Sequence, residues 1–268
     1  MTTPAFRSLI EDLENLGFDR RHLLKAMGTA AVLGPLGCGT SAGVDGDPSA
    51  SGGAWAVGGT GLLASTKDPF SAGLGSACAV YKASTLGPCH ALTVDRADIS
   101  EGLLGLPLRL ELLVVDPSCA PLPGATVEIW HAGTTGLYSG SDASPMCTSG
   151  DASALSGRWF RGIQTADAKG RLRFDTLYPG WYPSRTIHIH FTVRVGATEY
   201  LTSQLFFDDS LSADILASHP SYSARGQKDT PNASDKVVTE SGLVDYLLQT
   251  EQQADGTLLA WKAIVVHA

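Results

Sequence analysis

Alternating apolar and polar positions predict most of the secondary structure of this chain. The stretch from Leu106 to Val114 has period two, and its apolar face holds Leu106, Leu108, Leu110, Leu112 and Val114. Successive side chains of a strand point to opposite faces, so this pattern indicates a strand with one face in a core. Further strand candidates are ATVEIWHA, RWFRGIQT, GRLRFDTL, TIHIHFTVRV, EYLTSQLFF and DGTLLAWKAIVVH, separated by Gly, Asp or Pro turns. Regular spacing without long helical stretches predicts an all-β fold, an antiparallel β-sandwich.

Helical patterns are few. Only SLSADILAS and SGLVDYLLQT indicate helix, so we expect one or two short helices. The segment 208–233 is predicted to be a long loop with a short helix. Long loops commonly shape binding sites in otherwise regular domains.

The N-terminal residues are typical of an export signal. Arg20 and Arg21 precede a short apolar run that ends at Gly37, so residues 1–38 resemble a bacterial twin-arginine signal. The alternative is an ordinary amphipathic helix that carries an arginine pair. Cys38 is a candidate for lipid attachment, the one route to a membrane that we consider, although Pro35 stands where such signals usually carry Leu.

The next segment, residues 39–70, is rich in Gly, Ser and Ala and predicts a flexible linker. Residues 71–268 would then form the folded domain. The length of 268 residues with 43% hydrophobic content suits one such domain with an extension. The net charge of −8 and the lack of a basic stripe disfavour nucleic acid as a partner.

Four cysteines remain when Cys38 is set aside, and an even number in an exported domain suggests two disulfides. Three pairings are possible. Proximity in sequence favours Cys78–Cys89 with Cys119–Cys147. None of these cysteines has CxxC spacing, which argues against a zinc ribbon.

Candidate metal-binding and catalytic residues are concentrated in YPGWYPSRTIHIHF, residues 178–191, which contains two tyrosines, one arginine and two histidines. On a strand His188 and His190 share a face, so both imidazoles could reach one metal ion. The plainer interpretation is a half-exposed strand with two solvated histidines.

The motifs VEIWHAGTTGLYSG, RGIQTADAKGRLRFDTLYPGWYPSRTIHIHF and TSQLFFDD together resemble the intradiol ring-cleavage dioxygenases, the protocatechuate and catechol dioxygenase family. The similarity runs from Leu86 to the C-terminus, and the exported single-domain branch is nearest. It implies a prealbumin-like sandwich with a non-haem Fe(III) held by Tyr138, Tyr182, His188 and His190. It also implies catalytic roles for Arg185, placed over the substrate ring, for Tyr182, which leaves the metal with a substrate proton, and for Gln204.

The implied reaction cleaves a catechol between its two hydroxyls with O2 and gives a cis,cis-muconate-type diacid. Phenolate ligands suit this chemistry because hard anionic oxygens stabilise ferric iron, and only a strong cation keeps a tyrosine ionised at neutral pH. The resemblance therefore implies a catechol and O2 as the small-molecule partners. Which catechol is used, and the oligomeric state, stay open.

Each residue also has a structural interpretation. Tyr138 and Tyr182 could be turn tyrosines, Gln204 a buried amide, and Arg185 could pair only with Asp175 or a carbonyl. His131 is expected to be structural or to support the ligands, and Trp181 to pack. His90 and His219 have no assigned role.

Two departures from the family pattern stand out. Ala132 of WHAG replaces the cysteine usual in exported relatives, so Cys147 is a candidate partner of Cys119. Cys89 and His90 of LGPCHA stand where an aromatic residue usually lies at the pocket rim, which leaves substrate preference open.

Two other classes of protein would explain part of this sequence. A metal-free secreted β-sandwich binding module would explain export and acidity, but not the paired tyrosines and histidines at this spacing. A cupin-type metal enzyme also uses His-x-His on a strand, but it usually needs a glutamate about four residues later, where this chain has Arg194.

Overall fold

The structure is a computed structural model that describes residues 53–268, except 65, 75–77 and 244–245. The predicted export signal 1–38, Cys38 and the linker residues 39–52 lie outside the described residues. No helix among the described residues is both long and apolar enough to cross a membrane.

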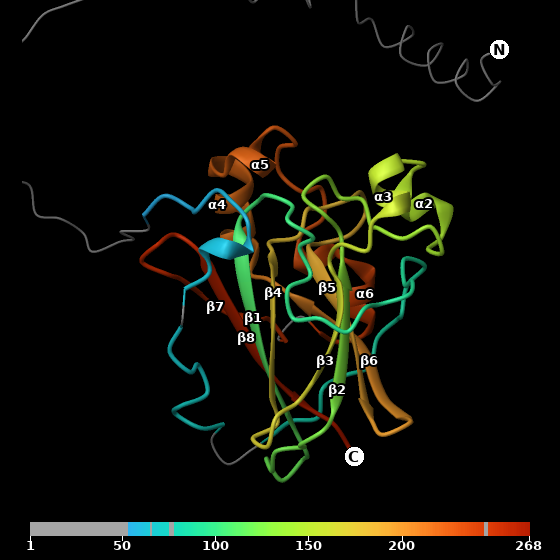
Figure 1. The fold of residues 1–268 in the computed structure, drawn as a ribbon, viewed down its shortest axis with the longest axis vertical. Coiled ribbons are helices and arrows are strands. Elements are labelled where there is room, and N and C mark those ends of the chain that lie inside the picture. The colour runs from blue at the N-terminus through green and yellow to red at the C-terminus, as the bar shows by residue number, and fades with distance from the viewer. Residues whose placement is uncertain (1–52, 65, 75–77, 244–245) are drawn as a thin grey trace, which may run out of the picture. The chain divides into compact units, whose positions relative to one another are not determined.

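In the described part of the chain, eight strands form two four-stranded sheets (Figure 1). The first has the order β4-β1-β8-β7, with β4 at Arg171–Leu177, β1 at Pro107–Val115, β8 at Leu258–Val265 and β7 at Gln249–Gln252. The second has the order β3-β2-β5-β6, with β3 at Arg161–Thr165, β2 at Thr126–His131, β5 at His188–Val195 and β6 at Thr198–Phe206. The prediction of a mainly β domain is confirmed.

One strand pairing corrects the expected all-antiparallel arrangement. Within the described residues, β8 runs parallel to β1, with Leu108 opposite Leu258 and Val115 opposite Val265. The other pairings between named strands are antiparallel. A parallel neighbour needs a long crossover, and here most of the chain separates the two strands.

The core lies where the apolar faces of both sheets meet. The five residues of the predicted apolar face around β1 are fully buried, and Ile189, Phe191 and Val193 of β5 are buried in the same cluster. The other face of β1 is covered as well. Leu113 and Val115 pack with Phe70 and Val265 in a smaller cluster.

The predicted helix in SLSADILAS is confirmed as α4, Asp209–Ser218. It begins at Asp208, whose carboxylate accepts hydrogen bonds from the N–H groups of Ser210 and Leu211. The helix predicted in SGLVDYLLQT is wrong for its described residues. Gly242 adopts a left-handed φ of 64° directly after a short helix, and the chain then enters β7.

The remaining helices are short, and α2 to α5 lie toward the upper end of the strands in Figure 1. They are η2 at Thr60–Leu62, α2 at Pro145–Thr148, α3 at Ala152–Ser156, α5 at Pro220–Ser223, η3 at Asn232–Ser234 and α6 at Lys236–Glu240. The segment 208–233 therefore carries α4, α5 and the start of η3, and contains more helix than expected.

The described part of the predicted linker, residues 53–64 and 66–70, lies against the domain. The Trp55 indole N–H donates to Asp214 at 2.7 Å, and Gly58 pairs with Gly105. Phe70 is buried against β1 and β8. The Gly- and Ser-rich segment therefore contains residues that contact the folded domain. The domain boundaries stay a prediction.

The disulfides are Cys78–Cys119 and Cys89–Cys147, with Cα–Cα separations of 5.5 and 5.6 Å. The preferred pairing from sequence proximity was wrong, and so was the pairing of Cys147 with Cys119. The α2 segment folds back over residues 87–92, where the Ser144 N–H donates to the Pro88 carbonyl at 3.3 Å. This contact brings Cys147 to Cys89.

Candidate metal centre

One strand and two loops bring the predicted ligand residues together. His188 and His190 begin β5 on one face, and His190 pairs with Trp130 of β2. Tyr138 lies in the loop after β2, and Tyr182 in the loop between β4 and β5. These loops touch at Gly133 and Gly180, where the Gly180 N–H donates to the Gly133 carbonyl at 3.1 Å. A Cβ on Gly180 would lie 2.4 Å from that carbonyl oxygen, so the close approach requires glycine.

The four side chains converge on one point. The Nε2 atom of His188 lies 3.1 Å from the Tyr182 hydroxyl, 3.4 Å from the Tyr138 hydroxyl and 3.1 Å from Nε2 of His190. The two hydroxyls are 3.5 Å apart. Two atoms bound to one first-row metal at about 2.0–2.1 Å each are separated by about 3 Å. The cluster therefore has the spacing of adjacent ligands of a single ion.

The two imidazoles are neutral and could donate a nitrogen lone pair to a metal ion. Nδ1 of His188 lies 2.7 Å from the Thr186 carbonyl, which can only accept, so Nδ1 carries the proton and Nε2 presents a lone pair. Burial lowers the pKa of His188 and of His190 well below the usual value, which keeps both rings neutral.

The ring of His190 is held between its neighbours. Trp130 stacks on it at 5.0 Å between ring centres, with the planes 9° apart. On another side Gly87, with a left-handed φ of 74°, comes so close that a Cβ would lie 3.0 Å from Cε1 of His190. Nδ1 of His190 is buried and has no hydrogen-bond partner among the described residues. On the Nδ1 side, ring packing orients this imidazole.

The two phenols would ionise only beside a strongly charged cation. Burial raises the pKa of Tyr138 well above its usual value, and burial also raises the pKa of Tyr182. Two protonated phenols and two neutral imidazoles carry no charge, so only a bound cation would ionise the phenols. The residues present therefore fit ferric iron. The described residues hold no cluster of three or more His, Cys, Asp or Glu placed for a metal, so any ion here depends on the tyrosines.

Arg185 and Gln204 lie together beside this cluster. Nη2 of Arg185 donates to Oε1 of Gln204 at 2.5 Å, and Nε donates to Oδ2 of Asp235 at 2.8 Å. The alternative partner Asp175 instead pairs with Arg109 at 2.8 Å. Gln204 is fully buried on β6 opposite His190. Arg185 therefore joins Gln204 and Asp235 in one hydrogen-bonded group, and the Asp235 carboxylate was not predicted from the sequence.

Asp235 is the most connected of the missed residues. It is fully buried, accepts from the Thr186 N–H at 2.8 Å and caps α6 through the N–H groups of Val237 and Val238. The sequence signal was an Asp directly before a short apolar helix, which marks a helix cap. Nothing in the sequence indicated its pairing with Arg185, fifty residues away.

Arg161 was also missed. It is fully buried, and its guanidinium donates to the carbonyls of Ser139 and Cys89 at distances from 2.5 to 3.0 Å. These bonds tie the residue after Tyr138 to the segment before His90. No pattern around Arg161 distinguishes it from an ordinary strand arginine.

The other candidates take structural roles. His131 is buried, with Nδ1 at 2.9 Å from the Ala132 carbonyl and Nε2 at 2.8 Å from the Thr176 hydroxyl, so it links the two sheets. His90 bonds Glu128 at 2.8 Å. His219 caps α5, and Trp181 packs against Arg225.

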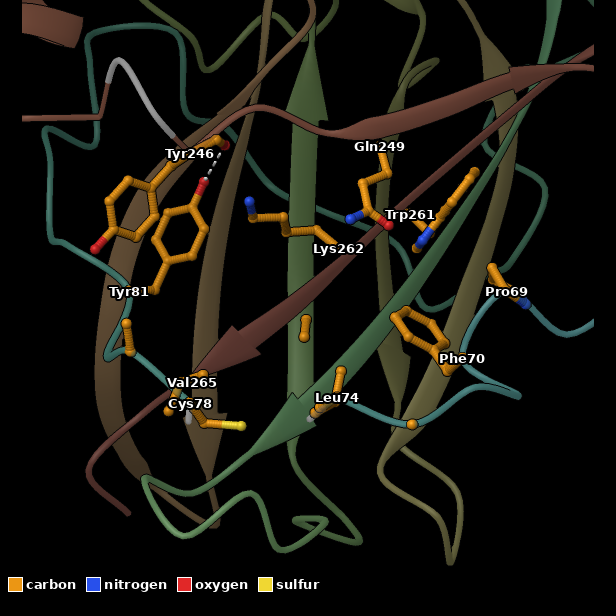
Figure 2. A pocket seen from close by; sticks show the side chains of 13 residues that line it. Pro69, Phe70, Leu74, Cys78, Tyr81, Tyr246, Gln249, Trp261, Lys262 and Val265 are labelled. Atoms are coloured by element: carbon orange, nitrogen blue, oxygen red, sulfur yellow. Dashed lines mark hydrogen bonds between the residues drawn. The ribbon is translucent and has the colours of Figure 1, made fainter. Parts of the chain in front are cut away.

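A cavity of about 360 Å³ opens beside the cluster and is lined by both tyrosines and by the Cys89–Cys147 disulfide. A second cavity, of about 570 Å³, lies on the first sheet between Phe70, Tyr246 and Trp261 (Figure 2). It contains none of the predicted site residues. Its link to the cluster is Tyr81, whose hydroxyl donates to the Gln204 carbonyl at 2.9 Å.

Replacing Asp235 with Asn is expected to lower the free energy of unfolding by about 2–3 kcal/mol, because its bonds to Arg185 and Thr186 lose a charged acceptor. If the cluster binds a metal that supports turnover, kcat/KM should fall about tenfold at unchanged metal content. Urea unfolding, metal analysis and steady-state kinetics measure these changes. Asp214→Asn, at an exposed acceptor remote from the cluster, is the matched control. Equal effects of both substitutions on kcat/KM would contradict a positioning role for Asp235.

Comparison with known proteins adds a family context. A family model described as Dioxygenase matches residues 84–246, which include all six predicted site residues. Catechol 1,2-dioxygenase 1 of Acinetobacter lwoffii is 29% identical over 169 residues, which are 56% of this chain and 50% of that protein. Chlorocatechol 1,2-dioxygenase of Pseudomonas putida is 26% identical over 154 residues, 49% of this chain and 52% of that protein. The chain thus spans about half the length of these curated relatives.

Solved structures are similar over a larger share of their length. The intradiol ring-cleavage dioxygenase from Tetranychus urticae has a TM-score of 0.63 at 27% identity, covering 70% of this chain and 95% of that one. The dioxygenase domain of a carbohydrate-binding protein fusion from Streptomyces sp. SirexAA-E has a TM-score of 0.50 at 23% identity, covering 70% and 97%. The latter likeness concerns the fold alone.

Proposed function

This chain belongs to the intradiol ring-cleavage dioxygenase family, and from that premise we propose that it cleaves a catechol between its hydroxyls with O2. The product would be a cis,cis-muconate-type diacid. The observation that carries the proposal is the convergence of Tyr138, Tyr182, His188 and His190 on one point at ligand spacing.

The four residues would hold a non-haem Fe(III). When bound, this ion would supply a Lewis-acidic centre that binds the catechol oxygens and activates the substrate ring toward O2. Two phenolates would offset the charge of the ion, and the two imidazoles would add neutral donors. This donor set differs from the two-histidine, one-carboxylate set of Fe(II) oxygenases.

The two tyrosines have different surroundings, which suggests different roles. Tyr138 is 2% exposed, and its backbone N–H donates to the Cys147 carbonyl at 2.8 Å. Both tyrosines line the cavity, but Tyr182 is only half-buried and is therefore the more accessible of the two. We assign Tyr182 the acceptance of a proton from a substrate hydroxyl, because a phenolate near the cavity can move and its conjugate acid is stable there.

Arg185 supplies a fixed positive charge close to the cluster. Asp235 and Gln204 hold its guanidinium from two sides, so it needs no reorganisation when negative charge develops on the substrate ring. Arg185 would act on the substrate directly. Gln204 would act through Arg185, as a positioning residue.

Two further proposals concern the fold and the export of the chain. The two sheets around one core would be the prealbumin-like β-sandwich of the family. Export by the twin-arginine route stays a prediction; that route carries folded proteins, so iron would load before export and both disulfides would close afterwards.

The test is oxygen uptake and ultraviolet product spectra of the iron-loaded protein across a panel of catechols. Muconate absorbance with one O2 consumed per substrate is expected. Yellow semialdehydes, the products of cleavage beside the hydroxyls, would contradict the assignment. So would a lack of uptake with every catechol by protein that contains iron.

A further inference from the structure

The cavity beside the tyrosines has one charged feature. Among the eleven described residues that line it, Arg225 is the single cation, and no carboxylate is present. Leu137, Met146 and Pro183 provide apolar surface on the same walls. Such a cavity combines room for an aromatic ring with one fixed positive charge.

Neutral groups hold Arg225 in place. Nη1 donates to the Trp181 carbonyl at 2.7 Å and to the Thr134 carbonyl at 3.3 Å. The guanidinium carbon lies 4.8 Å from the centre of the Trp181 ring, within cation–π range. Gly136 leaves space for it, because a Cβ there would lie 3.0 Å from both Nη1 and Nη2. The guanidinium is therefore preorganised by a carbonyl pair, an indole face and a glycine.

No carboxylate among the described residues forms an ion pair with Arg225. Burial lowers its pKa, and no neighbouring acid offsets that effect. An arginine nevertheless stays protonated, and only Nη1 of its nitrogens donates within the described residues. A half-buried cation without a counter-charge is costly, and a bound anion would remove that cost.

We propose that Arg225 binds an anionic substituent of the substrate, so that the enzyme prefers catechols that carry a ring carboxylate. The catechol hydroxyls would face Tyr138 and Tyr182, and the carboxylate would meet the guanidinium on the cavity wall. Arginine suits this task because its planar fork matches the two oxygens of a carboxylate. This inference rests on the proposed function of the same site.

Substrate kinetics of an Arg225→Gln variant test the proposal. The paired substrates are 3,4-dihydroxybenzoate and 4-methylcatechol, which differ at one ring position in charge but little in size. The KM for the carboxylate should rise about tenfold or more, while kcat/KM for 4-methylcatechol changes less than about twofold. Arg225→Lys should recover part of the loss. Arg173→Gln, at an exposed arginine of β4, is the control and should change neither value. Equal losses for both substrates would overturn the proposal.

A binding measurement separates this proposal from the proposed function. Calorimetry of the metal-free protein with 4-hydroxybenzoate and with 4-methylphenol needs no turnover. Binding of 4-hydroxybenzoate that is stronger in wild type than in Arg225→Gln supports the anion site even if no catechol is cleaved. Catechol cleavage with no effect of Arg225 on either ligand would refute the anion site and leave the proposed function standing.

Discussion

A Tyr138→Phe variant is expected to lose its bound iron and to lower kcat/KM by more than about 100-fold. The hydroxyl of Tyr138 lies 3.4 Å from Nε2 of His188 and is buried with it. Phenylalanine fills the same space but supplies neither an oxygen donor nor a negative charge, so the remaining donors would hold a ferric ion weakly. Iron content per chain, visible absorbance and oxygen uptake with a catechol measure the loss.

The matched control is Tyr178→Phe. Tyr178 is equally buried, but its hydroxyl bonds the Ser212 hydroxyl at 2.8 Å in the core, away from the cluster. Its loss should cost about 1 kcal/mol of stability and leave iron content unchanged. A Tyr138→Phe protein that retains iron and colour at the level of this control would show that Tyr138 is not a ligand.

The second large effect concerns the Cys89–Cys147 disulfide. Replacing both cysteines with alanine is expected to lower the free energy of unfolding by about 4 kcal/mol, because the closed loop is long and the unfolded chain gains its freedom. The sequence separation is 58 residues. Activity should fall as well, because the disulfide lines the cavity beside the tyrosines and the Cys147 carbonyl accepts from the Tyr138 N–H. Urea unfolding and steady-state kinetics measure the two effects.

The other disulfide is the control for that experiment. Cys78–Cys119 closes a loop of similar length, with a separation of 41 residues, but it lies beside the cavity of the first sheet. Its replacement by alanine should cost a similar stability, also about 4 kcal/mol, without a change in kcat/KM. Equal losses of activity in both double variants would show that the lower stability, and not the loss of the cavity wall, reduces activity.

The strands could be predicted because burial on one face imposes a period of two. The apolar residues of β1 and β5 alternate in this way, and the shared face of His188 and His190 is a direct consequence, although the opposite face of both strands is largely buried as well. The strand β7 was missed because Gln249–Gln252 is a short polar edge strand with no apolar alternation. The parallel pairing of β8 with β1 could not be predicted from the sequence of either strand, because it depends on how distant parts of the chain pack together.

The four ligand candidates were assigned from the resemblance to a family, and only the histidine pair also followed from periodicity. The partners of Arg185 could not be inferred, because Asp235 and Gln204 reach it through tertiary packing. The same holds for Arg225, whose sequence surroundings indicate only a polar loop. The predicted disulfide pairing was wrong for a related reason. The fold of the α2 segment, and not distance along the sequence, brings Cys147 to Cys89.

Resonance Raman spectroscopy of the iron-loaded protein, combined with metal analysis, tests the proposed ferric tyrosinate centre most directly. About one iron per chain is predicted, with tyrosinate vibrations enhanced under a visible charge-transfer band. Both should be lost in Tyr138→Phe and kept in Tyr178→Phe. Folded protein that takes up no iron, or that binds iron without tyrosinate vibrations, would contradict a centre built from Tyr138, Tyr182, His188 and His190.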